Sequence, residues 1–177
     1  MITPSRLASL PRRHFGMFPT PLHPAPELAA AFGLSRPLWV KRDDLTGPGL
    51  GGNKVRKLEF LIGQALDGAA DVLVTGGADQ SNHARLTAIL GAAAGIEVHL
   101  VLGGDEPSEW QGNQLLDRLA GARLHFAESE EWGVLEERIC SVAQKLASQG
   151  RRPYVIPIGG STPIGALGYV AGFFELL

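Results

Sequence analysis

The spacing of hydrophobic and polar positions changes repeatedly along this sequence, and from about residue 53 the change is regular. Short runs of branched apolar residues alternate with longer segments in which apolar residues recur every three or four positions. The first pattern is typical of buried strands and the second of helices. The expected helices cover residues 53–70, 81–94, 108–120, 132–148 and 164–177, and the expected strands cover residues 71–75, 96–102, 122–126 and 153–156.

Glycines punctuate this alternation. Gly95, Gly121 and Gly150 each follow an expected helix, where a glycine commonly forms the C-cap. Parallel neighbouring strands need long crossover connections, which the helices supply. The pattern therefore predicts the α/β class, with a parallel sheet covered by helices on both faces.

The two ends of the chain differ from this pattern. Residues 1–50 are rich in proline, with a helix expected near residues 25–32 and a strand at residues 38–41, and we interpret them as an arm that belongs to another layer. The last expected helix ends on Phe173-Phe174-Glu175-Leu176-Leu177, without a cap. Such an apolar end normally packs against more protein, so we expect the sequence to be truncated.

Composition narrows the function classes. The 177 residues are 45 % hydrophobic and 19 % charged, as in soluble globular proteins. A net charge of -2 gives no reason to expect a nucleic-acid or membrane partner. The start lacks a secretory signal and no apolar run reaches the length of a membrane helix, so the cytoplasm is the expected location.

The segment most indicative of chemistry is Gly51-Gly52-Asn53-Lys54, which leads into Val55-Arg56-Lys57. Two glycines allow a ligand to approach the backbone closely, and Lys54 falls in the first turn of a helix. The positive end of the helix dipole disfavours an ammonium and favours the neutral amine that condenses with an aldehyde. Lys57 lies on the same helical face, where it could hold an anionic group such as a phosphate. The alternative is a solvated basic face.

A second segment, Gly76-Gly77-Ala78-Asp79 followed by Gln80-Ser81-Asn82-His83, joins a strand to a helix start. Ligands of parallel sheets gather at the carboxyl ends of strands, near unpaired N–H groups of helix N-termini. Ser81 or Asn82 could equally be an N-cap alone. Because one cap residue suffices to start a helix, the run of polar residues favours a substrate site, in which His83 is either a surface residue or a donor or proton carrier.

Two further motifs have simpler interpretations. Gly159-Gly160-Ser161-Thr162-Pro163 resembles a phosphate-binding cup, but a strand-to-helix turn with Pro163 at the helix start is favoured. Arg42-Asp43-Asp44 lacks nearby histidine or carboxylate ligands for a metal and is interpreted as structural ion pairing.

Together these motifs resemble a known family in the right order along nearly the whole chain. The matching segments are Lys41-Arg42-Asp43-Asp44, Gly51-Gly52-Asn53-Lys54, Gln80-Ser81-Asn82-His83 with Arg85, and Arg152-Pro153-Tyr154-Val155-Ile156-Pro157 with Gly159-Gly160-Ser161. They resemble D-cysteine desulfhydrase and its relative 1-aminocyclopropane-1-carboxylate (ACC) deaminase.

The resemblance implies a tryptophan synthase β-like fold, in which pyridoxal 5'-phosphate lies between a large and a small α/β domain. Residues 1–50 would be the N-terminal arm of the large domain, residues 51–162 the small domain, and residues 163–177 the first helix returning to the large domain. Family members run to roughly twice this length, in keeping with two domains. A homodimer is implied for the full-length parent.

The resemblance also implies roles for the candidate residues. Lys54 would bind the cofactor covalently, Asn82 would hydrogen-bond its phenolic oxygen, and Asn53 and Lys57 would lie at the cofactor, with Lys57 near the phosphate. The substrate would contact residues Gln80, Ser81, Asn82 and His83, with Ser81 assisting proton movement.

The implied activity is a lyase or deaminase reaction on a small amino acid, and the chain is expected to be incomplete and only weakly active alone. His83 resembles the desulfhydrase branch, which converts D-cysteine to pyruvate, hydrogen sulfide and ammonia. ACC deaminase and L-cysteate sulfo-lyase are alternatives. Two rivals from other classes are a non-catalytic α/β fragment and a phosphosugar- or nucleotide-binding module that uses the helix start at Ser81.

Overall fold

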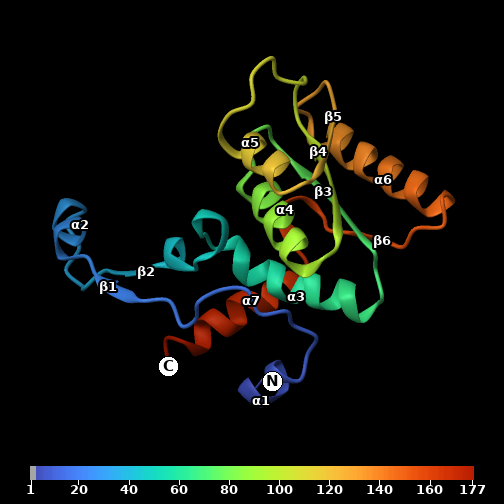
Figure 1. Ribbon diagram of the computed structural model, residues 1–177. Coiled ribbons are helices and arrows are strands. Elements are labelled where there is room, and N and C mark those ends of the chain that lie inside the picture. Colours follow the sequence, from blue (N-terminus) through green and yellow to red (C-terminus); the bar gives the residue numbers. More distant parts are fainter. Residues whose placement is uncertain (1–2) are drawn as a thin grey trace.

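A four-stranded parallel sheet forms the centre of the molecule (Figure 1). The structure is a computed structural model and describes residues 3–177. The strand order is β5-β4-β3-β6, with β3 and β4 in the middle. The sheet and its crossovers comprise α3 (Lys54–Asp67), β3 (Val72–Gly77), α4 (Asn82–Ala94), β4 (Glu97–Leu102), α5 (Gly112–Leu119), β5 (Arg123–Phe126), α6 (Trp132–Ser148), β6 (Pro153–Val155) and α7 (Pro163–Phe174). The expected α/β class and parallel sheet are confirmed.

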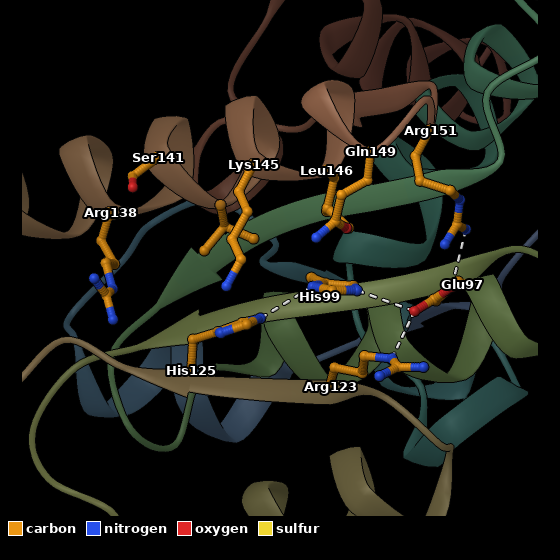
Figure 2. A pocket seen from close by; sticks show the side chains of 11 residues that line it. Glu97, His99, Arg123, His125, Arg138, Ser141, Lys145, Leu146, Gln149 and Arg151 are labelled. Atoms are coloured by element: carbon orange, nitrogen blue, oxygen red, sulfur yellow. Dashed lines mark hydrogen bonds and ion pairs between the residues drawn. The ribbon is translucent and has the colours of Figure 1, made fainter.

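Helix α6 covers one face of the sheet. Its residues Leu135, Ile139 and Leu146 are buried against Val74 and Val101 of the strands. The spacing of the three α6 residues keeps them on one helical face. Nearer the β4–β5 edge, this face becomes polar and borders a cavity (Figure 2).

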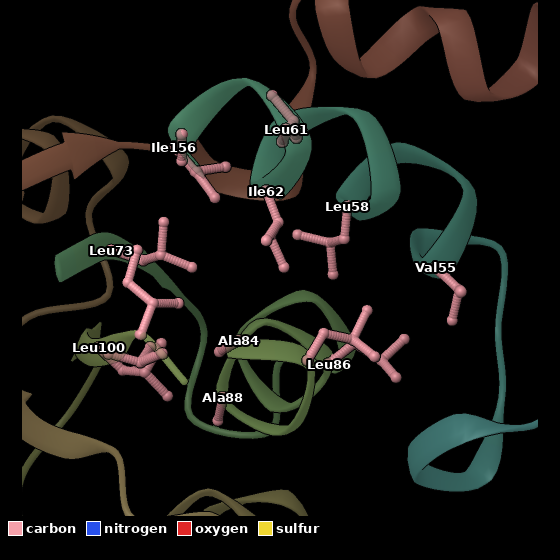
Figure 3. Close-up of a cluster of buried hydrophobic side chains, with 14 of the residues drawn as sticks. Val55, Leu58, Leu61, Ile62, Leu73, Ala84, Leu86, Ala88, Leu100 and Ile156 are labelled. Atoms are coloured by element: carbon pink, nitrogen blue, oxygen red, sulfur yellow. The ribbon is translucent and has the colours of Figure 1, made fainter. Parts of the chain in front are cut away.

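Helices α3 and α4 cover the opposite face, and their contact with the strands forms the larger apolar core (Figure 3). Leu58 and Ile62 of α3 meet Leu86 of α4 and Leu73 and Leu100 of the sheet, and all five side chains are inaccessible to solvent. Alternate residues of each strand point to opposite faces, so β3 must be apolar on both. This packing fixes the position of the first turn of α3 relative to the sheet.

The N-terminal arm extends away from the sheet (Figure 1). It contains α1 (Pro4–Ala8), β1 (Leu22–Pro24), α2 (Pro26–Ala31), β2 (Trp39–Lys41) and the short 3-10 helices η1 (Asp43–Leu45) and η2 (Pro48–Leu50). Strands β1 and β2 pair antiparallel. The helix and strand expected near residues 25–32 and 38–41 are present, whereas α1 and β1 were not expected.

Buried ion pairs fasten the arm to α3. Glu59, which has no solvent exposure, accepts hydrogen bonds from the Phe15 and Gly16 N–H groups at 2.6 and 2.8 Å and pairs with Arg12 at 2.6 Å. Arg56 pairs with Asp43 at 2.8 Å. Removing one partner of a buried pair leaves an uncompensated charge, so these contacts hold the arm in one position.

Three helix boundaries differ from the prediction by three or more residues. Helix α3 ends at Asp67 rather than at residue 70, and α7 ends at Phe174 rather than at residue 177. The third helix of the sheet region, α5, begins at Gly112 rather than at Ser108. The Gln80 side chain accepts a hydrogen bond from the Asn113 N–H at 2.8 Å and so caps the helix from a distant loop. None of the helices in residues 3–177 has the length and apolar character that a bilayer crossing requires.

Candidate active site

A glycine turn places Lys54 at the start of α3. Gly51 and Gly52 have φ values of 67° and 127°, which side chains rarely adopt. A Cβ atom at Gly51 would collide with the carbonyl oxygen of Asp44. The Gly52 N–H donates to the Asp43 carbonyl oxygen and the Thr46 hydroxyl, both at 2.9 Å. The turn is therefore rigid, and only glycine fits its tightest point.

The amine of Lys54 faces the turn between β6 and α7. Lys54 is half-buried, and a Cβ atom built on Gly159 would lie 3.9 Å from Nζ. Gly159 belongs to the 3-10 helix η3 (Ile158–Gly160) and has φ of 72°. Lys54 is also close enough to His83, in the first turn of α4, to lower the pKa of that imidazole. The amine therefore lies beside the β6–α7 turn and within electrostatic range of His83.

Lys57 points to the same turn. It is 8 % exposed, and its ammonium donates to the Gly159 carbonyl oxygen and the Ser161 hydroxyl, both at 3.0 Å. The ammonium also lies 5.7 Å from the ring centre of Tyr169 in α7. Burial, and then the charge of Lys54, lowers the pKa of Lys57. The solvated basic face considered for this helix is contradicted, because Lys57 is buried and bonded.

Asn53 links the start of α3 to α7. It is exposed and precedes α3 as the N-cap residue, but its side chain does not cap the helix. Instead its amide donates to the Tyr169 hydroxyl at 2.7 Å. The residue therefore lies at the mouth of the lysine site, and its expected contact with a cofactor stays a prediction.

The β3–α4 connection carries the second group of candidates. Ser81 is the N-cap of α4, and its hydroxyl accepts from the Ala84 N–H at 3.2 Å. A Cβ atom at Gly77, the last residue of β3, would approach the Ser81 hydroxyl within 2.5 Å, so glycine is needed for this close turn. The N-cap interpretation of Ser81 is correct, and its predicted role in proton movement is not tested by this geometry.

Asn113, which sequence reasoning missed, organises the exposed residues of this connection. Its side-chain amide donates to the Gln80 carbonyl oxygen at 2.7 Å and to the Asn82 Oδ1 at 3.1 Å. Its backbone N–H donates to the Gln80 side chain. Gln80 and Asn82 are thus held by the first turn of α5 at the carboxyl end of β3. No local pattern around residue 113 marks this role.

His83 does not face the open side of the site. It is 2 % exposed, and its Nε2 lies 3.1 Å from the Thr75 hydroxyl. Thr75 donates its proton to the Ile156 carbonyl oxygen, so Nε2 of His83 is the donor of this pair. Burial, followed by the charges of Lys54 and Lys57, lowers the pKa of His83 to about 3. The side chain is therefore neutral at physiological pH, which does not support direct substrate contact or proton shuttling.

Arg85 and Asp117 are two buried charged residues whose burial the sequence analysis did not anticipate. Arg85, 6 % exposed, donates to the Gly51 carbonyl oxygen at 3.2 Å and so supports the turn before Lys54. Asp117 of α5 is 1 % exposed, and neither carboxylate oxygen has a hydrogen-bond partner among the described residues. Burial raises the pKa of Asp117 to about 7, although the charge of Arg85 acts to lower it.

The two motifs given simpler interpretations behave as expected. Arg42 pairs with Asp44 at 2.7 Å, and Asp43 pairs with Arg56, in agreement with structural ion pairing. Thr162 is the N-cap of α7 and accepts from the Gly165 N–H at 3.0 Å, which confirms the strand-to-helix turn. This turn also receives both lysine side chains, so it borders the site.

Comparison with known proteins identifies the class to which this arrangement belongs. Residues 14–177 match the family described as "Pyridoxal-phosphate dependent enzyme", and the chain belongs to this family. The resemblance inferred from the motifs is confirmed.

Named relatives refine this placement. A putative ACC deaminase of Pyrococcus furiosus is 42 % identical over 97 % of the chain and 51 % of the relative. The mitochondrial bifunctional D-cysteine desulfhydrase/ACC deaminase of Arabidopsis thaliana is 40 % identical over 97 % of the chain and 45 % of the relative. D-cysteine desulfhydrase of Serratia proteamaculans is 41 % identical over 97 % of the chain and 52 % of the relative. The chain spans about half the length of these relatives.

Solved structures agree with the fold. The crystal structure of an ACC deaminase homologue superimposes with a TM-score of 0.90 at 41 % identity, covering 99 % of this chain and 54 % of that one. A pyridoxal 5'-phosphate-dependent aspartate racemase superimposes with a TM-score of 0.67 at 19 % identity, covering 89 % of this chain and 45 % of the other, a likeness of fold alone. The expected fold of pyridoxal-phosphate enzymes is confirmed.

Proposed function

We propose that this chain supplies the lysine-bearing part of a pyridoxal-phosphate-dependent lyase or deaminase acting on a small amino acid, with D-cysteine as the favoured substrate. The observation that carries the proposal is the placement of the Lys54 amine beside Gly159, in the same turn that accepts a hydrogen bond from Lys57.

The residues present fit a phosphate-bearing aldehyde. Two lysine amines face one glycine-containing turn, and they differ in their contacts. The Lys57 ammonium is hydrogen-bonded to that turn, whereas the Lys54 amine makes no hydrogen bond or ion pair among the described residues. Pyridoxal phosphate, when bound, supplies an aldehyde for a lysine amine and a ring that withdraws electrons from the substrate. Lys54 would hold the cofactor covalently, and Lys57 would place a positive charge near its phosphate.

Asn82 would orient the cofactor through its side-chain amide. The Oδ1 atom already accepts from Asn113, which leaves the amide N–H groups available as donors. A donor at this position would stabilise an anionic ring oxygen. Asn113 would act as a positioning residue, since it fixes the orientation of Asn82 without reaching the cofactor itself.

Substrate would lie over the β3–α4 connection. The N-terminus of α4 offers unpaired backbone N–H groups, which favour a carboxylate. Ser81 and Gln80 border this end of the helix, so we propose that they contact the substrate. His83, as a neutral and buried group, would support Ser81 and Gln80 from the core side of the helix.

In the proposed reaction D-cysteine and water yield pyruvate, hydrogen sulfide and ammonia. Loss of the α-proton precedes expulsion of the β-thiolate, and water replaces the amino group in the final imine hydrolysis. ACC deaminase activity is a second candidate that the relatives support equally by name. L-cysteate sulfo-lyase activity is a third candidate. We also propose that the full-length protein is a homodimer and that it works in the cytosol.

The test is an assay of the purified protein with D-cysteine, L-cysteate and ACC, with measurement of sulfide, sulfite and ammonia. We expect pyridoxal-phosphate-dependent release of sulfide from D-cysteine. Lys54→Arg retains the charge but cannot form the covalent link, so it should abolish turnover while leaving the fold intact. Ammonia release from ACC alone would favour the deaminase, and full activity of the arginine variant would refute the proposal.

A further inference from the structure

A cavity of about 420 Å³ lies between α6 and the β4–β5 edge of the sheet (Figure 2). It is on the face opposite to α3 and α4, and hence separate from the lysine site. Its lining is unusually basic: the charged residues are one carboxylate and four cationic groups, namely Glu97, Arg123, Arg138, Lys145 and Arg151. The two imidazoles of His99 and His125 lie on its floor.

Glu97 is already fully engaged. It pairs with Arg123 at 2.6 Å and with Arg151 at 2.9 Å, and it accepts from Nε2 of His99 at 3.0 Å. The hydrogen bond from His99, with those of Arg151 and the nearby arginine charges, lowers the pKa of Glu97 to about 2, although burial acts to raise it. Glu97 therefore pairs with Arg123 and Arg151, and among the described residues it forms no ion pair with Arg138 or Lys145 of α6.

The two histidines form a directed chain. His99 Nε2 lies 3.0 Å from Glu97 Oε1, and His99 Nδ1 lies 3.0 Å from Nε2 of His125. In the neutral tautomer of His99 that donates to Glu97, Nδ1 accepts and Nε2 of His125 is the donor. The rings stack with centroids 5.1 Å apart. Nδ1 of His125 is left as the ring atom without a partner among residues 3–177. It becomes a donor when the ring is protonated.

Arg138 and Lys145 project from α6 toward the strands (Figure 2). They are seven residues apart and so lie on one helical face. Within the part of the chain that the structure describes, neither forms an ion pair. Burial, and then the charges of His99, Arg138, Lys145 and Arg123, lowers the pKa of His125 to about 4. The Arg138 and Lys145 side chains are both exposed and line the cavity.

We propose that this cavity is a binding site for a small phosphorylated metabolite, held by Arg138 and Lys145 and distinct from the site of Lys54. An arginine matches two phosphate oxygens, and a lysine adds a point charge. The cavity has room for a phosphate monoester with its organic part, and the inference does not depend on the proposed enzymatic activity.

The test uses pyrophosphate as the probe, with affinity measured by calorimetry on the chain. Arg138→Gln/Lys145→Gln should weaken binding by about tenfold or more, since each loses a charge-assisted hydrogen bond. Arg13→Gln/Arg36→Gln removes the same charge from exposed positions outside the cavity and should leave the affinity unchanged. The altered side chains of both variants are exposed, so their melting temperatures should match.

Lys54→Ala separates this cavity from the proposed cofactor site. It should retain pyrophosphate binding, and the His125 ring resonances should shift on titration of both this variant and the unaltered chain. Equal weakening in both double variants would mean a non-specific charge effect and would overturn the proposal. Binding lost in Lys54→Ala but kept in Arg138→Gln/Lys145→Gln, or no binding at all, would overturn it as well.

Discussion

Replacing Glu175 with glutamine should destabilise the fold at neutral pH and have a much smaller effect in acid. Glu175 follows α7 and accepts from Arg56 of α3 at 2.7 and 2.9 Å, and its Oε2 lies 2.6 Å from the Lys41 ammonium. Arg56 is 2 % exposed and also pairs with Asp43. The substitution therefore removes a charge that joins α7, α3 and the arm.

The magnitude follows from the ionisation of this carboxyl. Burial acts to raise the pKa of Glu175, but hydrogen bonds from Arg56 and Lys41 outweigh it and lower the pKa from 4.5 to about 2. A difference of that size corresponds to about 3 kcal/mol. The Glu175 side chain is 13 % exposed, so solvent screening reduces the expected loss to about 2 kcal/mol.

The loss of stability in Glu175→Gln should depend on pH, in a direction set by the lowered pKa of Glu175. A carboxyl whose pKa is depressed on folding contributes stability above its unfolded pKa, and this is lost as the pH falls through the folded pKa. The difference between the unaltered chain and Glu175→Gln should thus be full above about pH 5 and less than half by about pH 3. Urea unfolding followed by circular dichroism at several pH values measures it.

Glu109→Gln provides the matched control, because Glu109 is exposed and makes no side-chain hydrogen bond or ion pair among the described residues. It should change the free energy of unfolding by less than about 0.5 kcal/mol. A loss for Glu175→Gln that is the same at pH 7 and pH 3, or no loss at pH 7, would refute the reasoning.

Two further predictions concern the site. Asn113→Ala should free the Asn82 amide and weaken pyridoxal phosphate binding by about fivefold to tenfold, through loss of one hydrogen bond, as measured by fluorescence titration; unchanged affinity would mean that Asn113 does not position Asn82. Asp117→Asn should be as stable as the unaltered chain near pH 4 and more stable by about 1–3 kcal/mol at pH 8. Burial raises the pKa of Asp117 from 3.8 to about 7, so ionisation of this carboxyl destabilises the fold as the pH rises above 3.8. Denaturant unfolding at both pH values tests this, and a variant less stable at pH 8 would contradict it.

The repeating elements could be predicted because local signals agreed with the final packing. Buried strand β3 is apolar on both faces, and Gly95 ends α4 in the left-handed conformation that its position predicted. Ser81 begins the same helix as an N-cap. Such features depend on residues close in sequence.

The features that were missed depend on contacts between distant segments. The start of α5 is set by Gln80, 33 residues away from Asn113, and β1 is only three residues long and exposed. His83 could have been recognised as buried, because it lies three and seven residues before the core residues Leu86 and Leu90 and hence on their face of the helix. Its polar neighbours in sequence concealed that pattern.

The most direct test of the account is to find which lysine binds the cofactor. The protein would be incubated with pyridoxal phosphate, reduced with borohydride, digested and mapped by mass spectrometry. We predict a phosphopyridoxyl group on Lys54 and none on Lys41, Lys57 or Lys145, with the label lost in Lys54→Arg. A label on another lysine, or one that persists in the variant, would contradict the claim that Lys54 is the cofactor-binding residue.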